Sequence, residues 1–188
     1  MIVTLQPILT NALGGPILKE QVSVKQWLGV FLGFAGALLV LGLDIGSDIP
    51  LIGLLATILA LIAITASTIW QKKLSNNLPL SVSNMYQALG GFTFHLLIII
   101  FFAKPYIDFT QTFVIAMGHQ IFLVSFGAFT ILMFLIKKNS ASKTVSIFFL
   151  IPPTSAFMAW LFLNENLTSL DLVGFFIATV GVYIATRD

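Results

Sequence analysis

Polar side chains that could hydrogen-bond a small solute lie inside the longest apolar runs of this chain. Gln6, Thr10 and Asn11 fall at separations of four and five within residues 2–18, so a helix would place them on one side. An unpaired amide or hydroxyl is costly in hydrocarbon, so such groups should face a bundle interior or a water-filled cavity. We therefore predict a solute-binding cavity, whose further candidate residues are Thr65, Thr68, Trp70, Tyr86, Gln87, Thr154 and Ser155.

Each of these residues also has a purely structural interpretation. A serine or threonine hydroxyl within a helix can bond a carbonyl of its own helix. Trp70 and Tyr86 could instead belong to the aromatic belt at the membrane surface.

His95 is the only ionisable side chain that falls deep in any apolar run. Imidazole ordinarily changes its charge close to neutral pH, which makes His95 the candidate for proton coupling. The alternative is a neutral histidine that hydrogen-bonds a neighbouring helix. No carboxylate lies at the centre of an apolar run, so carboxylate-based coupling has no candidate here.

The residue inventory argues against enzymatic chemistry. The sequence contains no Gly-Lys-Ser/Thr phosphate loop, which excludes ATP-driven transport at the motif level. Two histidines and no cysteine give no basis for a metal cluster, and no nucleophile and base pair indicates a membrane hydrolase. We predict no enzyme activity, no metal and no cofactor.

The composition places the chain in a lipid bilayer. Of its 188 residues, 58% are hydrophobic and only 9% are charged, and the mean hydropathy is +1.03. Such a chain lacks the polar residues that a water-soluble surface needs. Its formal charge of +2 is too small to suggest a nucleic-acid partner.

The apolar runs predict an all-α, polytopic membrane bundle. Each run approaches the ~20 residues that cross the hydrocarbon core, and backbone amides in lipid must be satisfied within their own helix. A short interfacial helix could lie within residues 105–117. The seven predicted spans are residues 2–18, 27–43, 51–71, 83–103, 118–136, 144–163 and 170–186.

Charge placement orients these spans, because cytoplasmic loops collect Lys and Arg. Eight of the nine basic residues fall on the side that carries the C-terminus, and Lys104 alone falls on the other. The acids Asp44, Asp48, Asp108, Glu165 and Asp171 lie mostly opposite. We therefore predict a multi-pass membrane protein with a cytoplasmic C-terminus. The short loops and the many Lys and Ile residues indicate a bacterial inner membrane.

The two ends of the chain are related by an ungapped repeat. Residues 5–38 align with residues 150–183 at a constant offset of 145. The predicted loops place Glu20 in the cytoplasm and its counterpart Glu165 outside, so the two helix pairs should be inverted. The identical pairs are Leu5/Leu150, Pro7/Pro152, Leu18/Leu163, Glu20/Glu165, Gly29/Gly174, Phe31/Phe176 and Gly36/Gly181.

An inverted tandem repeat requires an odd number of helices in each unit, which here is five. Residues 44–188 then form a complete second repeat, and residues 1–43 form the last two helices of the first. Seven helices of a ten-helix, five-plus-five architecture are present. Either three helices are missing before Met1, or the seven-helix chain completes its pseudosymmetry by pairing with another chain, for example as a homodimer.

Several motifs resemble those of EamA-type transporters of the drug/metabolite transporter superfamily. They are Leu150-Ile-Pro152, Leu163-Asn-Glu165-Asn-Leu167, Gly174 and Gly181-Val-Tyr-Ile, with Leu5-Gln-Pro7, Leu18-Lys-Glu20, Gly29 and Gly36 in the earlier copy. Trp70-Gln-Lys-Lys-Leu74 and Gln87-Ala-Leu-Gly-Gly91 also look like the family pattern. The resemblance implies a carrier of two inverted five-helix repeats that moves small metabolites, such as amino acids or drugs.

The paired signature residues have both structural and functional interpretations. Pro7, Pro152 and Pro153 each remove a helix hydrogen bond, which suits either a hinge beside a cavity or a packed kink. Glu20 and Glu165 lie in short turns, where each could cap the next helix or form a gating ion pair. The glycines, with Gly33 and Ala178, lie at small-residue spacing and predict close helix contact.

The sequence thus predicts a secondary transporter of small metabolites that works by alternating access. The alternative from another class is a non-transporting membrane scaffold or assembly partner. The expected partners are the lipid bilayer and a small-molecule substrate.

Overall fold

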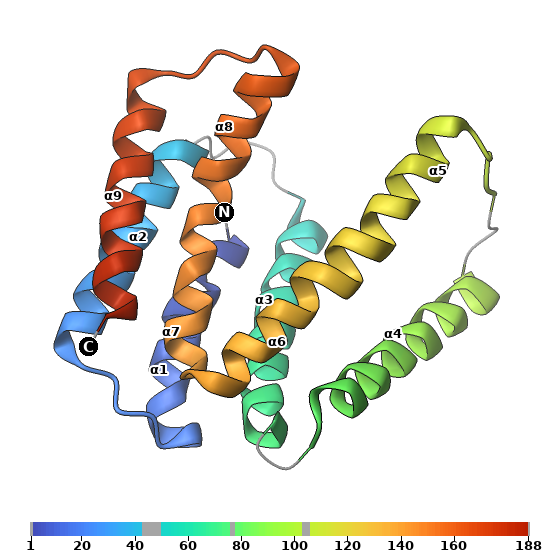
Figure 1. Ribbon diagram of the computed structural model, residues 1–188, viewed down its shortest axis with the longest axis horizontal. Helices are drawn as coiled ribbons and strands as arrows, with labels where there is room; N and C mark the ends of the chain where they lie inside the picture. Colours follow the sequence, from blue (N-terminus) through green and yellow to red (C-terminus); the bar gives the residue numbers. More distant parts are fainter. Residues whose placement is uncertain (1, 43–49, 76–77, 103–105, 188) are drawn as a thin grey trace. The chain divides into compact units, whose positions relative to one another are not determined.

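The structure, a computed structural model, describes residues 2–42, 50–75, 78–102 and 106–187, and every regular element in these ranges is a helix (Figure 1). Six helices have the length and composition to cross a membrane, and a shorter apolar helix covers Ile2–Leu18. The predicted all-α membrane chain is therefore confirmed. The expected repeat boundary at residues 43 and 44, the ends of two spans at residues 43 and 103, and Asp44, Asp48 and Lys104 lie outside the described residues.

The elements follow one another as a series of helices, some of them joined without a break. They are η1 (Ile2–Leu5), α1 (Gln6–Leu18), α2 (Val24–Leu41), α3 (Leu51–Ser75), α4 (Leu80–Phe102), α5 (Gln111–Gly118), η2 (His119–Ala128), α6 (Phe129–Lys138), α7 (Ala141–Ser146), η3 (Ile147–Leu150), α8 (Ile151–Leu163) and α9 (Ser169–Thr186).

One predicted span was wrong at its start. We expected a span over residues 118–136 and allowed for a short interfacial helix within residues 105–117. Instead α5, the π-helical η2 and α6 form one helix over Gln111–Lys138, which begins where the Thr110 hydroxyl accepts a hydrogen bond from Phe113 N at 3.2 Å. A capping side chain lets a polar first turn join an apolar helix, so hydropathy alone places the start too late.

Three further helices begin earlier than predicted, and two of the starts have the same cause. Helix α2 begins at Val24 rather than residue 27, because the Ser23 hydroxyl accepts from Gln26 N at 3.1 Å. Helix α7 begins at Ala141 rather than residue 144, with Ser140 as its cap, and α4 begins at Leu80 rather than residue 83. Helix α3 continues beyond its predicted end to Ser75.

The backbone repeats at the offset of 145 that the sequence shows. Elements η1, α1 and α2 correspond residue by residue with η3, α8 and α9. Both loops turn through a left-handed residue, Lys19 with φ 57° and Asn164 with φ 55°. Pro7 and Pro152 each occupy the second residue of an α-helix that follows a 3-10 turn, where no α-helical partner for the amide is lost. The five-plus-five organisation stays a prediction.

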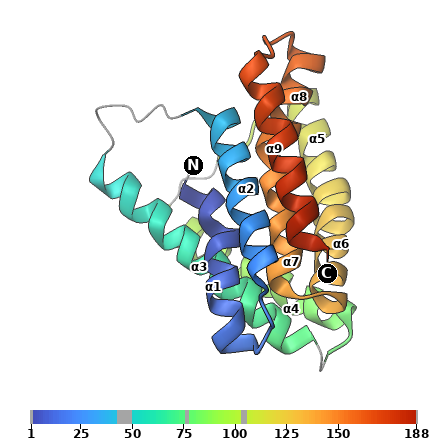
Figure 2. The same ribbon diagram turned by 90° about the vertical axis from the view of Figure 1, so that its left-hand side faces the viewer.

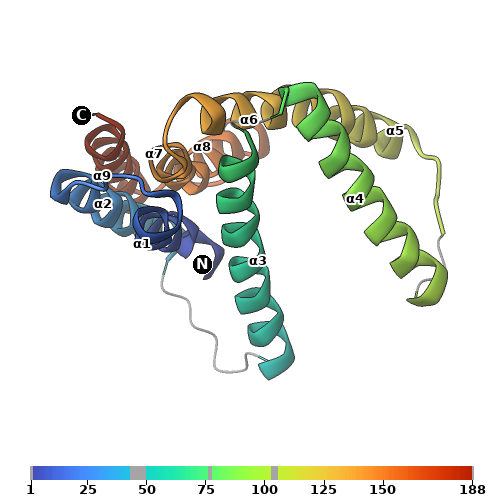
Figure 3. The same cartoon turned by 90° about the horizontal axis from the view of Figure 1, so that it is seen from below.

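Contacts divide the chain into two compact units, Met1–Lys73 with Asn139–Asp188, and Leu74–Lys138. In the first unit α2 and α9 pack most extensively, and they run side by side in two views (Figures 2 and 3). Its core is formed mainly by α2, α9 and η3, and contains Val30, Ala37, Phe149, Val182 and Ala185.

The α2–α9 contact is antiparallel and made by small residues. Ideal Cβ atoms built on Gly29 and Gly36 would lie 2.3 Å from Ala185 N and 2.4 Å from Ala178 N. The sequence number rises along one helix as it falls along the other. If both helices span the membrane, they cross it in opposite directions.

The second unit contains α4 and the long helix from α5 to α6. Lys137 Nζ donates to Leu78 O at 3.1 Å, which ties the end of α6 to the start of α4. Ser83 is the one buried residue of α4 among those described, and nearly all of the remaining side chains of this helix are exposed.

Candidate functional site

Buried polar side chains join α1 to α2, α3 and α7. We call Gln6, Thr10, Asn11, Gln26, Thr68 and Ser142 the polar seam; each is at most 6% exposed. Gln6 Nε2 donates to Thr68 Oγ1 on α3 at 3.1 Å, and Gln26 Nε2 of α2 donates to Asn11 Oδ1 at 2.8 Å. The predicted inward direction of the α1 side chains agrees with this arrangement.

Two atoms of the polar seam have no hydrogen-bond partner among the described residues. They are Thr10 Oγ1 and Asn11 Nδ2, on side chains that are 0% and 2% exposed. A buried, unpaired polar group costs about 1–3 kcal/mol of stability. Such groups need a further partner, such as a water molecule or a bound solute.

Glu20 connects the α1–α2 loop to the start of α7. Its carboxylate accepts from Ala141 N at 2.7 Å and from Ser142 N at 3.2 Å. The Ser142 hydroxyl donates to Glu20 Oε2 at 2.8 Å and lies 3.5 Å from the carbonyl oxygen of Thr10. We expected a cap on the next helix, but the capped helix lies about 120 residues further along the chain.

Close packing at Gly14 makes this capping contact possible. A Cβ atom at Gly14 would lie 2.5 Å from Ser142 Oγ and 3.2 Å from Glu20 Oε2. The equivalent residue in the second copy is Ala159, and there Glu165 is exposed and its carboxylate caps no helix of the described chain. The two signature glutamates are therefore in different environments.

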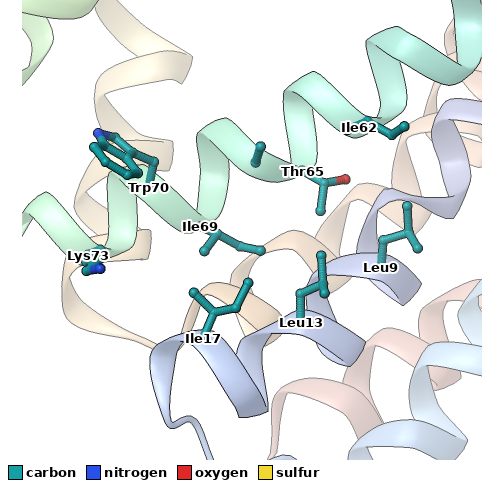
Figure 4. A pocket seen from close by; sticks show the side chains of 9 residues that line it. Leu9, Leu13, Ile17, Ile62, Thr65, Ile69, Trp70 and Lys73 are labelled. Atoms are coloured by element: carbon teal, nitrogen blue, oxygen red, sulfur yellow. The ribbon is translucent and has the colours of Figure 1, made fainter.

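An apolar groove of about 410 Å³ runs between α1 and α3 beside the polar seam (Figure 4). Its walls are mostly aliphatic, and Trp70 and Lys73 lie toward one end of it. The groove is lined by Leu9, Leu13, Ile17, Ile62, Thr65, Ala66, Ile69, Trp70 and Lys73.

Of the predicted cavity residues, those on α1 and α3 lie together. Thr65 is buried at 2% exposure, but its hydroxyl donates to Leu61 O of its own helix at 2.7 Å. Thr68 accepts from Gln6 and donates to Ile64 O at 2.9 Å. Trp70 is 65% exposed at the groove rim.

The other predicted residues do not join the polar seam. Tyr86 and Gln87 are exposed on α4 in the second unit. Thr154 is exposed and its hydroxyl lies 2.6 Å from Leu150 O, to which it donates, while Ser155 is exposed. The polar seam therefore has no counterpart on α8 of the second copy.

His95 is exposed on α4. Its Nδ1 lies 2.7 Å from Gly91 O of the same helix, and its ring meets Phe94 edge-on at 5.7 Å. Among the described residues, no other titratable side chain is seen in contact with this imidazole.

Gln26 and Ser142 were not among the residues predicted from the sequence. The predicted spans begin at residues 27 and 144, so Gln26 and Ser142 both fall in predicted loops. The capping pattern could have revealed both residues. Ser23 and Ser140 each accept a hydrogen bond from the backbone amide three residues later and so begin a helix, which places Gln26 and Ser142 inside helices.

Comparison with known proteins identifies the family. The EamA-like transporter family model matches residues 51–187, which include α3 to α9. "Uncharacterized transporter YvbV" of Bacillus subtilis (strain 168) is 29% identical over 192 residues, covering 96% of this chain and 60% of that protein. "WAT1-related protein At3g02690, chloroplastic" of Arabidopsis thaliana is 25% identical over 196 residues, covering 98% of this chain and 46% of that protein.

The chain thus spans 60% and 46% of the length of these two curated relatives. No solved structure gives a significant match. The family match covers well over half of the chain and agrees with its apolar helices and its motifs. This chain belongs to the EamA-like transporter family.

Proposed function

We propose that the chain belongs to a secondary transporter that moves a small polar metabolite across a bacterial inner membrane. The observation that carries this proposal is the polar seam, which holds two unpaired polar atoms inside an apolar helical protein. A protein without a polar ligand would gain stability from apolar side chains at these positions. The family match and the printed name of the Bacillus relative support the same class of function.

The chemistry of the polar seam bears on the kind of solute. Asn11 Nδ2 is a hydrogen-bond donor and Thr10 Oγ1 can donate or accept. A solute with carbonyl or carboxylate oxygens, such as an amino acid or a related metabolite, would satisfy both atoms.

Alternating access requires that the seam face each side of the membrane in turn. The 3-10 turns before Pro7 and Pro152 are the two related points where the helices can bend. The antiparallel α2–α9 pair would act as the common support. With the basic loops on the inside, the C-terminus of the protein lies in the cytoplasm.

A flux experiment tests the proposal. The chain, and a form completed to the length of its relatives, are reconstituted in proteoliposomes and screened with labelled amino acids and related metabolites. Asn11→Ala and Gln6→Ala should reduce flux at least tenfold for the transported solute. Thr93→Ala is the matched control, because Thr93 is exposed on α4 and its hydroxyl donates to Leu89 O of its own helix at 2.8 Å.

Equal flux in the wild type, Asn11→Ala and Gln6→Ala would show that the polar seam is not part of the transport pathway. Absence of any flux from both forms of the protein would favour the alternative function, a non-transporting membrane scaffold.

A further inference from the structure

The groove between α1 and α3 is apolar, in contrast to the polar seam beside it. Aliphatic side chains from both helices form its walls, and the Thr65 hydroxyl beside them already donates to Leu61 O. A polar metabolite would therefore find no hydrogen-bond partner along most of its length. An aliphatic chain would lose no hydrogen bonds on entering it.

One end of the groove is basic and aromatic. Lys73 is the one charged residue among the described side chains that line it, and Trp70 lies nearby (Figure 4). The preceding Lys72 is directed elsewhere, because its Nζ donates to Asn139 O at 2.6 Å. Lysine and tryptophan at the end of an apolar helix are typical of the level of the lipid headgroups.

The length of the groove fits one leaflet of the bilayer. The lining residues on α3 run from Ile62 to Lys73, which at 1.5 Å per residue is about 16 Å. Half of a hydrocarbon core that is ~30 Å thick is about 15 Å. A lipid with its headgroup at Lys73 would thus lay its acyl chain along the groove toward Leu9 and the middle of the membrane.

We propose that this groove binds an anionic phospholipid, with one acyl chain between α1 and α3 and the phosphate beside the Lys73 ammonium. The lipid would fill a space next to the polar seam and brace α1 against α3 without taking part in solute recognition. The site does not depend on which solute, if any, the protein transports.

Fluorescence quenching by brominated lipids tests the site in the full chain. The protein has three tryptophans, so Trp27→Phe with Trp160→Phe leaves Trp70 as the only indole. This variant is reconstituted in phosphatidylcholine vesicles that contain a few per cent of either brominated phosphatidylglycerol or brominated phosphatidylcholine. We expect Trp70 to be quenched more strongly by the brominated phosphatidylglycerol.

Two variants separate the charge from the groove. Lys73→Gln should lower the preference for phosphatidylglycerol about fivefold, as expected for one lysine at a membrane surface, while Lys138→Gln at the end of α6 should leave it unchanged. Ala66→Phe should fill the groove and remove the preference while Lys73 remains, and the exposure of Ala66 leaves room for the larger side chain.

Three results would overturn the proposal. Equal quenching of Trp70 by the two brominated lipids would exclude selective binding. A preference for phosphatidylglycerol that is unchanged in Lys73→Gln, or in Ala66→Phe, would show that the lipid does not bind in the groove.

Discussion

The contact between α2 and α9 leads to a prediction about stability. A Cβ atom added at Gly181 would lie 2.2 Å from Gly33 N and 2.8 Å from Gly29 O. Both neighbours are backbone atoms of α2, so no side chain can rotate to make room. The two helices must separate by about 1 Å to reach the 3.4 Å at which ordinary contact begins.

We expect Gly181→Ala to lower the free energy of unfolding by about 1–2 kcal/mol. Overpacking of a close contact costs about 1–3 kcal/mol, and the better helix propensity of alanine returns up to about 1 kcal/mol. The matched control is Gly90→Ala on α4, where an added Cβ atom meets no described atom within 4 Å. That substitution should be neutral or stabilising by up to about 1 kcal/mol.

Unfolding by sodium dodecyl sulfate in mixed micelles, followed by circular dichroism, measures both variants on one scale. Gly36→Ala on α2, whose Cβ atom would lie 2.4 Å from Ala178 N at a second point of the same contact, should behave like Gly181→Ala. If Gly181→Ala and Gly90→Ala unfold at the same detergent fraction, the close backbone contact between α2 and α9 is not present in the protein.

Three further substitutions, the first with a matched control, probe the caps and the polar seam. Glu20→Gln should lower the free energy of unfolding by about 1–2 kcal/mol in the same assay, because it weakens the charge-assisted hydrogen bonds to the amides of α7. The control Glu165→Gln, at an exposed residue, should cost less than about 0.5 kcal/mol. Equal losses in the two variants would contradict the capping role of Glu20. Thr168→Ala breaks the capping box of α9 and should cost about 1 kcal/mol, seen as faster amide exchange in the first turn of that helix and not in α2. Gln26→Leu leaves Asn11 Oδ1 without its donor and should cost about 1–3 kcal/mol, and a midpoint unchanged from wild type would show that this hydrogen bond is not made.

Much of the fold could be predicted from the sequence because lipid restricts the choices. Long apolar runs must be helices, and the small residues at Gly29, Gly33 and Gly36 fall on one face at a spacing that favours close packing. Gly29 and Gly36 contact Gly181 and Gly174 in the structure. Helix starts were less predictable, because a single hydroxyl such as that of Thr110 moves the start by several residues.

The candidate site could be predicted only in part. The placement of Gln6 and Asn11 on a single helix follows from the apolar run that contains them, which is local information. Their partners Thr68 and Gln26 come from other helices, and the helix that Glu20 caps begins at Ala141. Such pairings depend on how distant segments pack, which the spacing of residues along one helix does not encode.

Alternating access by inverted repeats requires that the α1–α2 and α8–α9 pairs cross the membrane in opposite directions. The chain contains no cysteine, so a single introduced cysteine can be labelled without background from other thiols of the chain. Gln21→Cys and Asn166→Cys occupy equivalent, exposed positions of the two loops. In intact cells a membrane-impermeant maleimide should label Asn166→Cys and leave Gln21→Cys unlabelled until the cells are opened. Labelling of both cysteines from the same side of the membrane would show that the two helix pairs are not inverted.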